Sequence, residues 1–248
     1  AGTALKYRQK GIDIISNNIA NVNTKGYKKN SANFEDALYS TYLKQYPDSV
    51  NSHYNIGTGS YLSNVERDFS QGNVEETQKN LDIALSGDGF IGVLDDGGNT
   101  LYTRGGSFSY TPATRNYKYI VNDQGYFLSD YRGNKIKIPD DVNEISIDDE
   151  GQINYEGSRK TIKLKLVKFS NPNGLVAQGS GLYSETQFSG KPIKNEDVSV
   201  RQGFLEMSNV DIANQMVELI KNQRIFSMNS KVIQTIDEMQ SLANKLRR

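Results

Sequence analysis

The stretch that decides the fold is residues 209–246, which read NVDIANQMVELIKNQRIFSMNSKVIQTIDEMQSLANKL. It contains no proline or glycine, so one helix of about 57 Å is allowed at 1.5 Å per residue. Apolar residues recur in two seven-residue registers, and the small shift between them is typical of a stutter in a coiled coil. Ser208 is predicted as the N-cap, with Asp211 three residues later. The predicted interface residues are Ile212, Met216, Leu219, Ile220, Phe226, Val232, Ile236, Met239 and Leu246.

A shorter stripe of the same kind begins the chain. Its apolar residues follow a heptad-like spacing, and Gly26 is placed to end the helix because glycine readily takes the left-handed conformation. This helix offers only about 27 Å of cover. Roughly half of the longer stripe is therefore expected to lack a cover within the chain, which implies other chains. The predicted interface residues here are Leu5, Ile12, Ile15, Asn18, Ile19, Asn21 and Val22.

Between the helices the sequence predicts β structure, with short strands and turns every eight to twelve residues. We therefore predict an α+β fold with discontinuous terminal coiled-coil helices and a central, mainly β domain, a small barrel or sandwich. The expected strands cover 81–85, 90–94, 101–104, 119–121, 126–128, 136–138, 145–147, 153–155 and 161–169.

The predicted boundaries join 1–28 with 205–248 as a terminal coiled-coil domain. They join 29–78 with 182–204 as a connecting segment, and leave 79–181 as the central β domain. Within the connecting segment, residues 34–39 are predicted as a short helix. Residues 47–59 are predicted as a loop, and a loop of that length is usually functional.

Composition excludes several classes of protein. The 248 residues carry 29 basic and 29 acidic side chains, which argues against a general nucleic-acid binder or a protein held on anionic lipid by bulk charge. The absence of cysteine excludes disulfides, thiolate metal sites and cysteine nucleophiles. No apolar run approaches the ~20 residues that span a bilayer, and no cleavable signal peptide is recognised. Fifteen tyrosines without tryptophan predict a wet β surface rather than a buried aromatic core.

Catalytic and nucleotide-binding patterns are weak. Residues 87–92 match G-x-G-x-x-G, but strand-like residues follow and position 110 is tyrosine, so a tight corner between strands is predicted instead. The single histidine, His53, lies in the predicted loop and builds neither a histidine triad nor a multi-histidine zinc site. The acid pairs fall in predicted turns. We therefore predict no enzyme, no cofactor and no metal. These acid pairs are Asp95/Asp96, Asp140/Asp141 and Asp148/Asp149.

Both ends of the chain resemble one protein family. Residues 12–24, IDIISNNIANVNT, followed by Gly26-Tyr27-Lys28, resemble the amino-terminal signature of bacterial flagellar rod and hook proteins. Residues 203–210, GFLEMSNV, through 223–224 and 229–231 to 243–244, are similar to the carboxyl-terminal motif of that family. The middle agrees at 81–84, 87–90, 102–104, 171–175 and 185–186.

Within the family, residues 56–59 and 70–73 look most like the distal-rod branch. Two features depart from the family pattern. Lys25 stands where the family often has a small residue or proline. The family also usually has several more helical residues before the position of Ala1, so we expect a trimmed amino terminus.

The resemblance implies a structural protein without enzymatic activity. Family members are exported through the flagellar type III apparatus without a cleaved signal. They then form a helical tube in the basal body, with the terminal helices inside and the β domain outside, and transmit motor torque to the hook. The implied partners are identical copies, other flagellar rod and hook proteins and the export apparatus, with no nucleic acid and no membrane insertion. The implied location is the basal body, beyond the cytoplasmic membrane in the periplasm or cell wall.

Three alternatives stay open. The first is a proximal rod or hook-type protein of the same family. The second is a secreted, β-rich, adhesin-like module whose helices form a closed trimer. The third is an enzyme acting on wall glycan, which would require an acid pair facing a groove.

Overall fold

The computed structural model describes residues 2–36, 39–43, 53–57, 60–114, 116–142, 144–155 and 161–246. The chain divides into two compact units. The first, called the helical unit, comprises Ala1–Ala20, Asn30–Arg67 and Asp211–Arg248; the second, called the β unit, comprises Asn21–Lys29 and Asp68–Val210. The predicted α+β class is confirmed, with a helix at each end and many strands between. This division groups residues 30–67 with the helices, whereas the sequence-based boundaries place 29–78 in a connecting segment.

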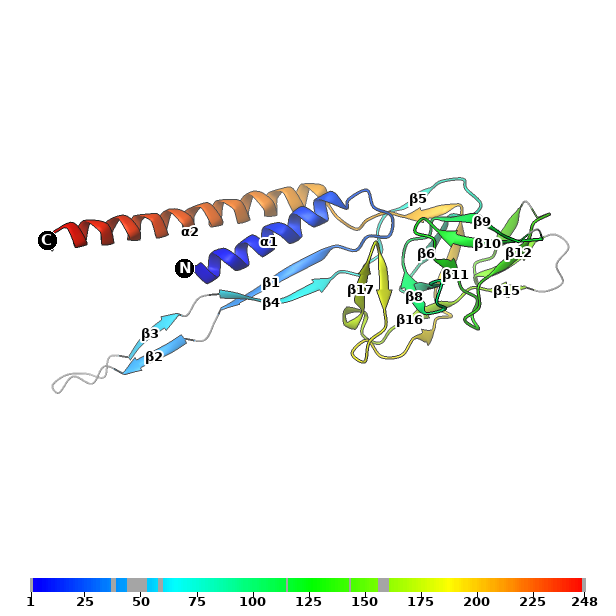
Figure 1. Ribbon diagram of the computed structural model, residues 1–248, viewed down its shortest axis with the longest axis horizontal. Helices are drawn as coiled ribbons and strands as arrows, with labels where there is room; N and C mark the ends of the chain where they lie inside the picture. The colour runs from blue at the N-terminus through cyan, green and yellow to red at the C-terminus, as the bar shows by residue number, and fades with distance from the viewer. Residues whose placement is uncertain are drawn as a thin grey trace. The chain divides into compact units, whose positions relative to one another are not determined.

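The helical unit is built around two long helices. Helix α1 (Gly2–Ala20) packs against α2 (Ile212–Leu246) and against a β ribbon (Figure 1). The ribbon pairs β1 (Asn30–Asp36) with β4 (Ser60–Arg67) in antiparallel fashion, and β2 (Tyr39–Leu43) pairs with β3 (His53–Gly57). Two side-chain contacts, Arg8 with Asn222 and Asn18 with Gln215, show that α1 and α2 run antiparallel.

Two predictions for the segment after α1 are wrong. The short helix predicted for 34–39 is replaced by strand, because residues 34–36 belong to β1 and Tyr39 begins β2; residues 37 and 38 lie outside the described residues. Pairing with β4 along the whole of β1 overrides the weak local helix preference. Of the loop predicted for 47–59, residues 53–57 form β3, and the others lie outside the described residues.

Helix α1 ends at Ala20, six residues before the predicted stop at Gly26. The next residues are short and polar, and they hydrogen-bond locally: the Thr24 N–H donates to the Asn21 carbonyl at 3.1 Å, and the Thr24 hydroxyl donates to the Asn21 Oδ1 at 3.1 Å. Such bonds compete with helix continuation. Gly26 has a φ of 65°, and a Cβ there would lie 2.6 Å from the Gly105 nitrogen. Gly26 therefore serves a tight contact inside the β unit, not a helix end.

The N-cap of α2 is Asp211, three residues after the predicted cap at Ser208. The Asp211 Oδ1 accepts the backbone N–H of Asn214 at 3.1 Å, and its Oδ2 accepts the Asn214 side-chain amide at 2.7 Å. The Gln215 N–H donates to the Asp211 carbonyl at 3.0 Å. A carboxylate at this position satisfies a free N–H and opposes the positive end of the helix dipole. The hydroxyl of Ser208 instead accepts the Val210 N–H.

Replacing this cap should weaken the helical unit measurably. We expect Asp211→Ala to lower the free energy of unfolding by about 1 kcal/mol, because an N–H at the start of α2 loses its acceptor. Asp211→Asn keeps an acceptor oxygen, so its free energy of unfolding should fall by only about a few tenths of a kcal/mol. Far-UV circular dichroism during urea unfolding measures both variants. An equal loss in the two variants would show that capping is not the cause.

The β unit is organised around a ten-stranded sheet with an open strand order, so the described strands form no closed barrel. All of the strand pairs are antiparallel. The main path is β12 (Lys137–Pro139), β10 (Tyr117–Asn122), β11 (Phe127–Leu128), β7 (Phe90–Leu94), β8 (Thr100–Thr103), β18 (Leu182–Ser184) and β17 (Val176–Gly179). Beside it lie β9 (Phe108–Thr114), β16 (Leu166–Lys168) and β19 (Ile193–Lys194).

Smaller sheets and one 3-10 turn complete the β unit. One sheet joins β13 (Ile145–Ile147), β14 (Gln152–Tyr155) and β15 (Ile162–Lys163). Two pairs join β6 (Ile83–Ser86) with β20 (Ser199–Gln202) and β5 (Val74–Glu76) with β21 (Phe204–Glu206). The 3-10 turn η1 covers Pro172–Gly174. The long strand predicted for 161–169 is divided between β15 and β16, because the Leu164 and Lys165 N–H groups donate to the Gly151 and Ser129 carbonyls.

The core of the β unit holds an aliphatic cluster and an aromatic one. The aliphatic cluster includes Ile91, Val93 and Ile153, all fully buried. In the second cluster, Phe90, Tyr102, Phe169 and Tyr183 are buried and pack edge-to-face. The expectation that aromatic residues stay at the surface is therefore wrong for this cluster.

The glycine pattern at 87–92 forms the predicted corner between β6 and β7. Gly87 has a φ of 106°, which favours glycine. A Cβ on Gly89 would lie 2.9 Å from the Asn195 Nδ2, and one on Gly92 would lie 2.8 Å from the Lys165 Cδ. These glycines therefore allow close packing of neighbouring segments.

Candidate assembly surfaces

An uncovered apolar seam follows the distal half of α2. Every residue from 234 to 246 is exposed. Val232, Ile236, Met239 and Leu246 are 55%, 49%, 60% and 88% exposed. We call the exposed apolar residues of this region the distal seam; they are Met228, Val232, Ile236, Met239, Leu242 and Leu246.

The difference in helix length explains why this seam is bare. Helix α1 has 19 residues and α2 has 35, which at 1.5 Å per residue gives about 28 Å against about 52 Å. Within the helical unit, α1 can therefore cover little more than half of α2. An exposed apolar surface of this extent is typical of a protein–protein contact.

The other predicted interface residues of the helices fall into two groups. On α2, Ile212, Met216 and Ile220 are exposed, whereas Leu219 and Phe226 are half-buried. On α1, the apolar residues are half-buried in a helix that packs against α2 and the ribbon. These half-buried residues are Leu5, Ile12, Ile15 and Ile19. Met228 and Leu242 are also exposed on α2, although the seven-residue registers did not predict them as interface residues.

Three predicted residues near the end of α1 occupy different settings. Asn18 is 1% exposed, and its side-chain amide donates to the Asn30 carbonyl and to the Gln215 Oε1. Val22 lies half-buried in the turn after α1. Asn21 lines a polar hollow of about 430 Å³ in the β unit.

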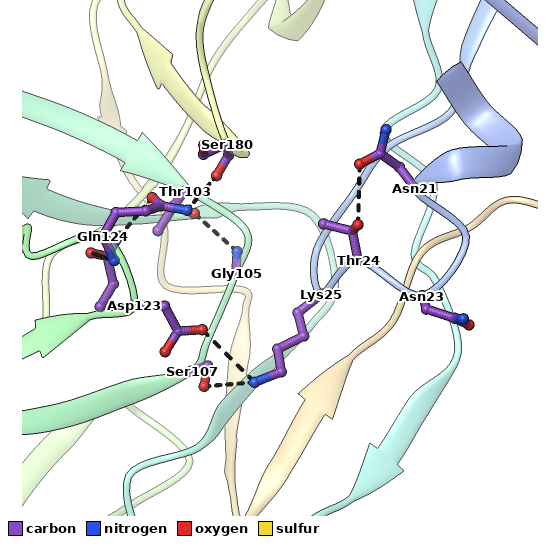
Figure 2. Close-up of a pocket in the computed structure, with 11 residues that line it drawn as sticks. Asn21, Asn23, Thr24, Lys25, Thr103, Gly105, Ser107, Asp123, Gln124 and Ser180 are labelled. Atoms are coloured by element: carbon purple, nitrogen blue, oxygen red, sulfur yellow. Dashed lines mark hydrogen bonds and ion pairs between the residues drawn. The ribbon is translucent and has the colours of Figure 1, made fainter. Parts of the chain in front are cut away.

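This hollow, shown in Figure 2, is lined by hydroxyl, amide and charged groups. The Lys25 amino group lies 2.9 Å from the Ser107 Oγ and 3.8 Å from an Asp123 carboxylate oxygen. The Gln124 amide donates to the Ser180 carbonyl at 3.0 Å. Because the Lys25 and Asp123 side chains are 41% and 63% exposed, their attraction is screened by water. The hollow offers hydrogen bonds but no preorganised reactive group.

The β unit contains a buried charge cluster formed by Lys28, Arg104 and Glu206. Glu206 in β21 accepts from the Lys28 Nζ at 2.6 Å and from the Arg104 Nε at 2.7 Å, and all three side chains are at most 3% exposed. Lys28 comes from the segment after α1, whereas Glu206 shortly precedes α2 in the chain. The segment that follows α1 and the segment that precedes α2 are therefore joined inside the β unit through the Glu206 carboxylate.

The remaining polar atoms of this cluster are also satisfied. The Lys28 Nζ donates to the Ser70 carbonyl, and the Glu206 Oε1 accepts the Gly72 N–H. Arg104 donates to the carbonyls of Gly89 and Gly87 at 2.6 and 2.7 Å. Burial lowers the pKa of Lys28, although the neighbouring Glu206 opposes this shift. Sequence reasoning missed this cluster, although Lys28 and Glu206 both lie inside the quoted terminal motifs.

Two of the predicted turn acids, Asp95 and Asp148, accept local hydrogen bonds. Asp95 accepts from the Asn99 backbone and side chain, and the side-chain hydrogen bond lowers the pKa of Asp95. Asp148 accepts the N–H groups of Glu150 and Gln152. His53 begins β3. Within the described ranges, no group of three or more His, Cys, Asp or Glu residues could hold a metal ion. Across the same residues, no helix has the length and apolar character needed to cross a bilayer.

Comparison with protein families gives three matches along the chain. Residues 1–28 match the family described as flagella basal body rod protein. Residues 84–155 match the flagellar hook protein FlgE/F/G D1 domain, and residues 201–246 match the flagellar basal body rod FlgEFG protein C-terminal family. The three matches contain Lys28, Arg104 and Glu206 respectively, so all three residues of the buried charge cluster lie in family-matched segments.

Individual proteins are similar over the whole length. The chain is 37% identical to flagellar basal-body rod protein FlgG of Borreliella burgdorferi, across 100% of this chain and 97% of that protein. It is 38% identical to FlgG of Agrobacterium fabrum, across 99% and 97%. It is also 31% identical to flagellar hook-basal body complex protein FlhP of Bacillus subtilis, across 100% and 97%. On this identity and coverage, the chain belongs to the flagellar basal-body rod protein family.

Proposed function

We propose that this chain is a structural subunit of the distal rod in the bacterial flagellar basal body, where identical copies pack into a helical tube. The observation that carries the proposal is the distal seam, whose residues are about half to nine-tenths exposed along the end of α2. Relatives similar over their full length are named flagellar basal-body rod proteins, which supports the rod as the location.

Apolar burial supplies the driving force for this assembly. Fully burying a large apolar side chain contributes about 1.5–3 kcal/mol, so covering the exposed half of Ile236 or Met239 contributes about half of that, and each copy carries several such side chains on the seam. A contact between two different surfaces of the same protein generates an open helical filament when its rotation does not close. Zero net charge avoids long-range repulsion between stacked copies.

In this proposal the helical unit contributes lateral contacts through α2. Torque would pass through those lateral contacts to the hook, so their rigidity is the working property. The proposed partners are identical copies, other rod and hook proteins and the flagellar export apparatus. We propose no enzymatic activity, because the turn acids Asp95 and Asp148 are engaged in local hydrogen bonds.

Light scattering of the purified chain against concentration tests the proposal. We expect the mean mass to keep rising with concentration, because each added copy exposes a new seam. Electron images of the concentrated sample should show elongated assemblies of indefinite length. A fixed mass, such as a trimer that no longer grows, would contradict the rod and favour a closed, stalk-like oligomer.

A further inference from the structure

Helix α1 is attached to α2 by polar contacts at two levels. Near the end of α1, the Asn18 amide donates to the Gln215 Oε1 at 2.9 Å. Ten residues earlier, the Arg8 guanidinium donates to the Asn222 Oδ1 at 3.3 Å. Asn18 and Asn222 are only 1% and 6% exposed. The helix–helix contact therefore contains buried amides, not only apolar side chains.

The Asn18 side chain makes hydrogen bonds to two other elements, β1 and α2. Besides Gln215, it donates to the Asn30 carbonyl at 2.8 Å, and its Oδ1 accepts the Asn30 N–H at 3.0 Å. One side chain thus joins α1 to the first residue of β1 and to α2. A displacement of α1 along α2 would break the bond to Gln215, and the two bonds to Asn30 fix the orientation of the Asn18 amide that makes it.

The contact between Arg8 and Asn222 is also closely packed. The Arg8 Cζ lies 4.6 Å from the centre of the Phe34 ring in β1, and a Cβ on buried Gly11 would lie 2.8 Å from that ring. Asn222 also donates to the Glu218 carbonyl one turn back along α2, at 2.8 Å. The Asn222 oxygen is therefore oriented toward Arg8.

Apolar packing alone would not select this alignment. Ile12, Ile15 and Ile19 are spaced three and four residues apart, so sliding α1 by one turn replaces one isoleucine by another. Buried amides do not tolerate such a slide, because each would lose its partner while remaining out of water. A single buried asparagine is known to fix the register of coiled coils in this way.

We infer that Asn18 and Asn222 are positioning residues that set the register of α1 on α2 and thereby the length of the distal seam left bare. One helical turn is about 5.4 Å, so a one-turn slide of α1 toward the end of α2 would cover part of the seam. The consequence for assembly rests on the proposed function, whereas the register itself is a property of a single chain.

The absence of cysteine from this chain makes the register directly measurable. Exposed Ser16 on α1 and exposed Ser227 on α2 can be replaced by cysteine and spin-labelled. The distance between the labels is then measured by pulsed electron resonance in dilute, monomeric protein. We expect one narrow distance in this background. In Asn18→Leu, Asn222→Leu and Arg8→Met we expect a second distance about 5 Å away, in at least a fifth of the molecules.

Asn229→Leu is the matched control, because Asn229 is a half-buried amide on α2 that takes part in neither polar level. It should keep the single distance. If Asn18→Leu fails to fold, the other two variants carry the test, because they leave the three bonds of Asn18 intact. The inference is overturned if every folded variant keeps one distance, or if the background protein already shows several.

Failure of this inference and failure of the proposed function give different results. An unchanged register in the variants, with open-ended growth of the unsubstituted chain, would reject the positioning role alone. A fixed-mass oligomer of the unsubstituted chain, with a shifted register in the variants, would reject only the rod.

Discussion

Replacing Glu206 by glutamine should lower the free energy of unfolding of the β unit by about 3–5 kcal/mol, the largest expected loss from a single substitution in this protein. Glu206 is the anion that Lys28 and Arg104 share, and it is fully buried. Glutamine has nearly the same shape but no charge, so two cations would remain out of water without a counter-charge. Urea unfolding followed by tyrosine fluorescence measures the effect.

The pH dependence of this variant provides an independent signature. Burial lowers the pKa of Lys28 below its ordinary value of 10.5, while Glu206 partly opposes the shift. Between the lowered pKa and 10.5 the folded protein binds fewer protons at Lys28 than the unfolded chain, so stability rises with pH in that window. Without Glu206 the pKa falls further and the window widens. The deficit of Glu206→Gln should therefore shrink as the pH rises from about 7 to about 10.

An exposed ion pair of the same unit is the matched control. Lys168 and Asp197 lie 2.9 Å apart, but their side chains are 45% and 83% exposed. Asp197→Asn should change stability by less than about 1 kcal/mol, and this difference from the unsubstituted chain should not shrink as the pH rises. If Glu206→Gln lost no more stability than this control, the buried cluster would not be a major source of the stability of the β unit.

The double substitution Ile236→Asp with Met239→Asp should abolish assembly and leave the monomer folded. Both side chains are about half exposed within the chain, so the two substitutions together should change the unfolding free energy by no more than about 1 kcal/mol. In an assembled seam, however, two buried carboxylates without partners would each cost several kcal/mol. We expect at least about a hundredfold higher concentration to be needed for growth, measured by light scattering.

Ser241→Asp is the control for this experiment. Ser241 is exposed on the same turns of α2, but at 100° per residue it lies on the opposite side of the helix from Ile236 and Met239. It adds one carboxylate outside the distal seam, against two in the double variant, and should assemble nearly as the unsubstituted chain does. Normal growth of the double variant would place the contact elsewhere on the molecule.

Local periodicity was enough to predict the two helices and, except for β9, the strands between residues 81 and 169; it did not predict β1 to β5 or β17 to β21. The stripe from Ile212 to Leu246 is a spacing of apolar residues three and four positions apart, which is visible in the sequence itself. The corner at 87–92 was also predictable, because glycines between two short strands indicate a tight turn. The resemblance of the terminal motifs gave the family, which the comparisons confirmed.

Other features required the tertiary structure. Residues 34–36 become strand because β4 pairs with them, and β4 lies about thirty residues later in the chain. The cap at Asp211 and the end of α1 at Ala20 depend on individual side-chain hydrogen bonds among several candidates of similar propensity.

The sequence by itself therefore determined the two terminal helices, most of the strands between residues 81 and 169, and that the long apolar stripe exceeds the cover available from the shorter helix. Only the tertiary structure decided where that stripe is left bare, which amides fix the alignment of the helices, and that Lys28, Arg104 and Glu206 share one buried site. The physical reason is range: periodic patterns arise from neighbours within one or two turns. The bonds from Glu206 to Lys28 and Arg104 instead join residues 178 and 102 positions apart, which no local pattern records.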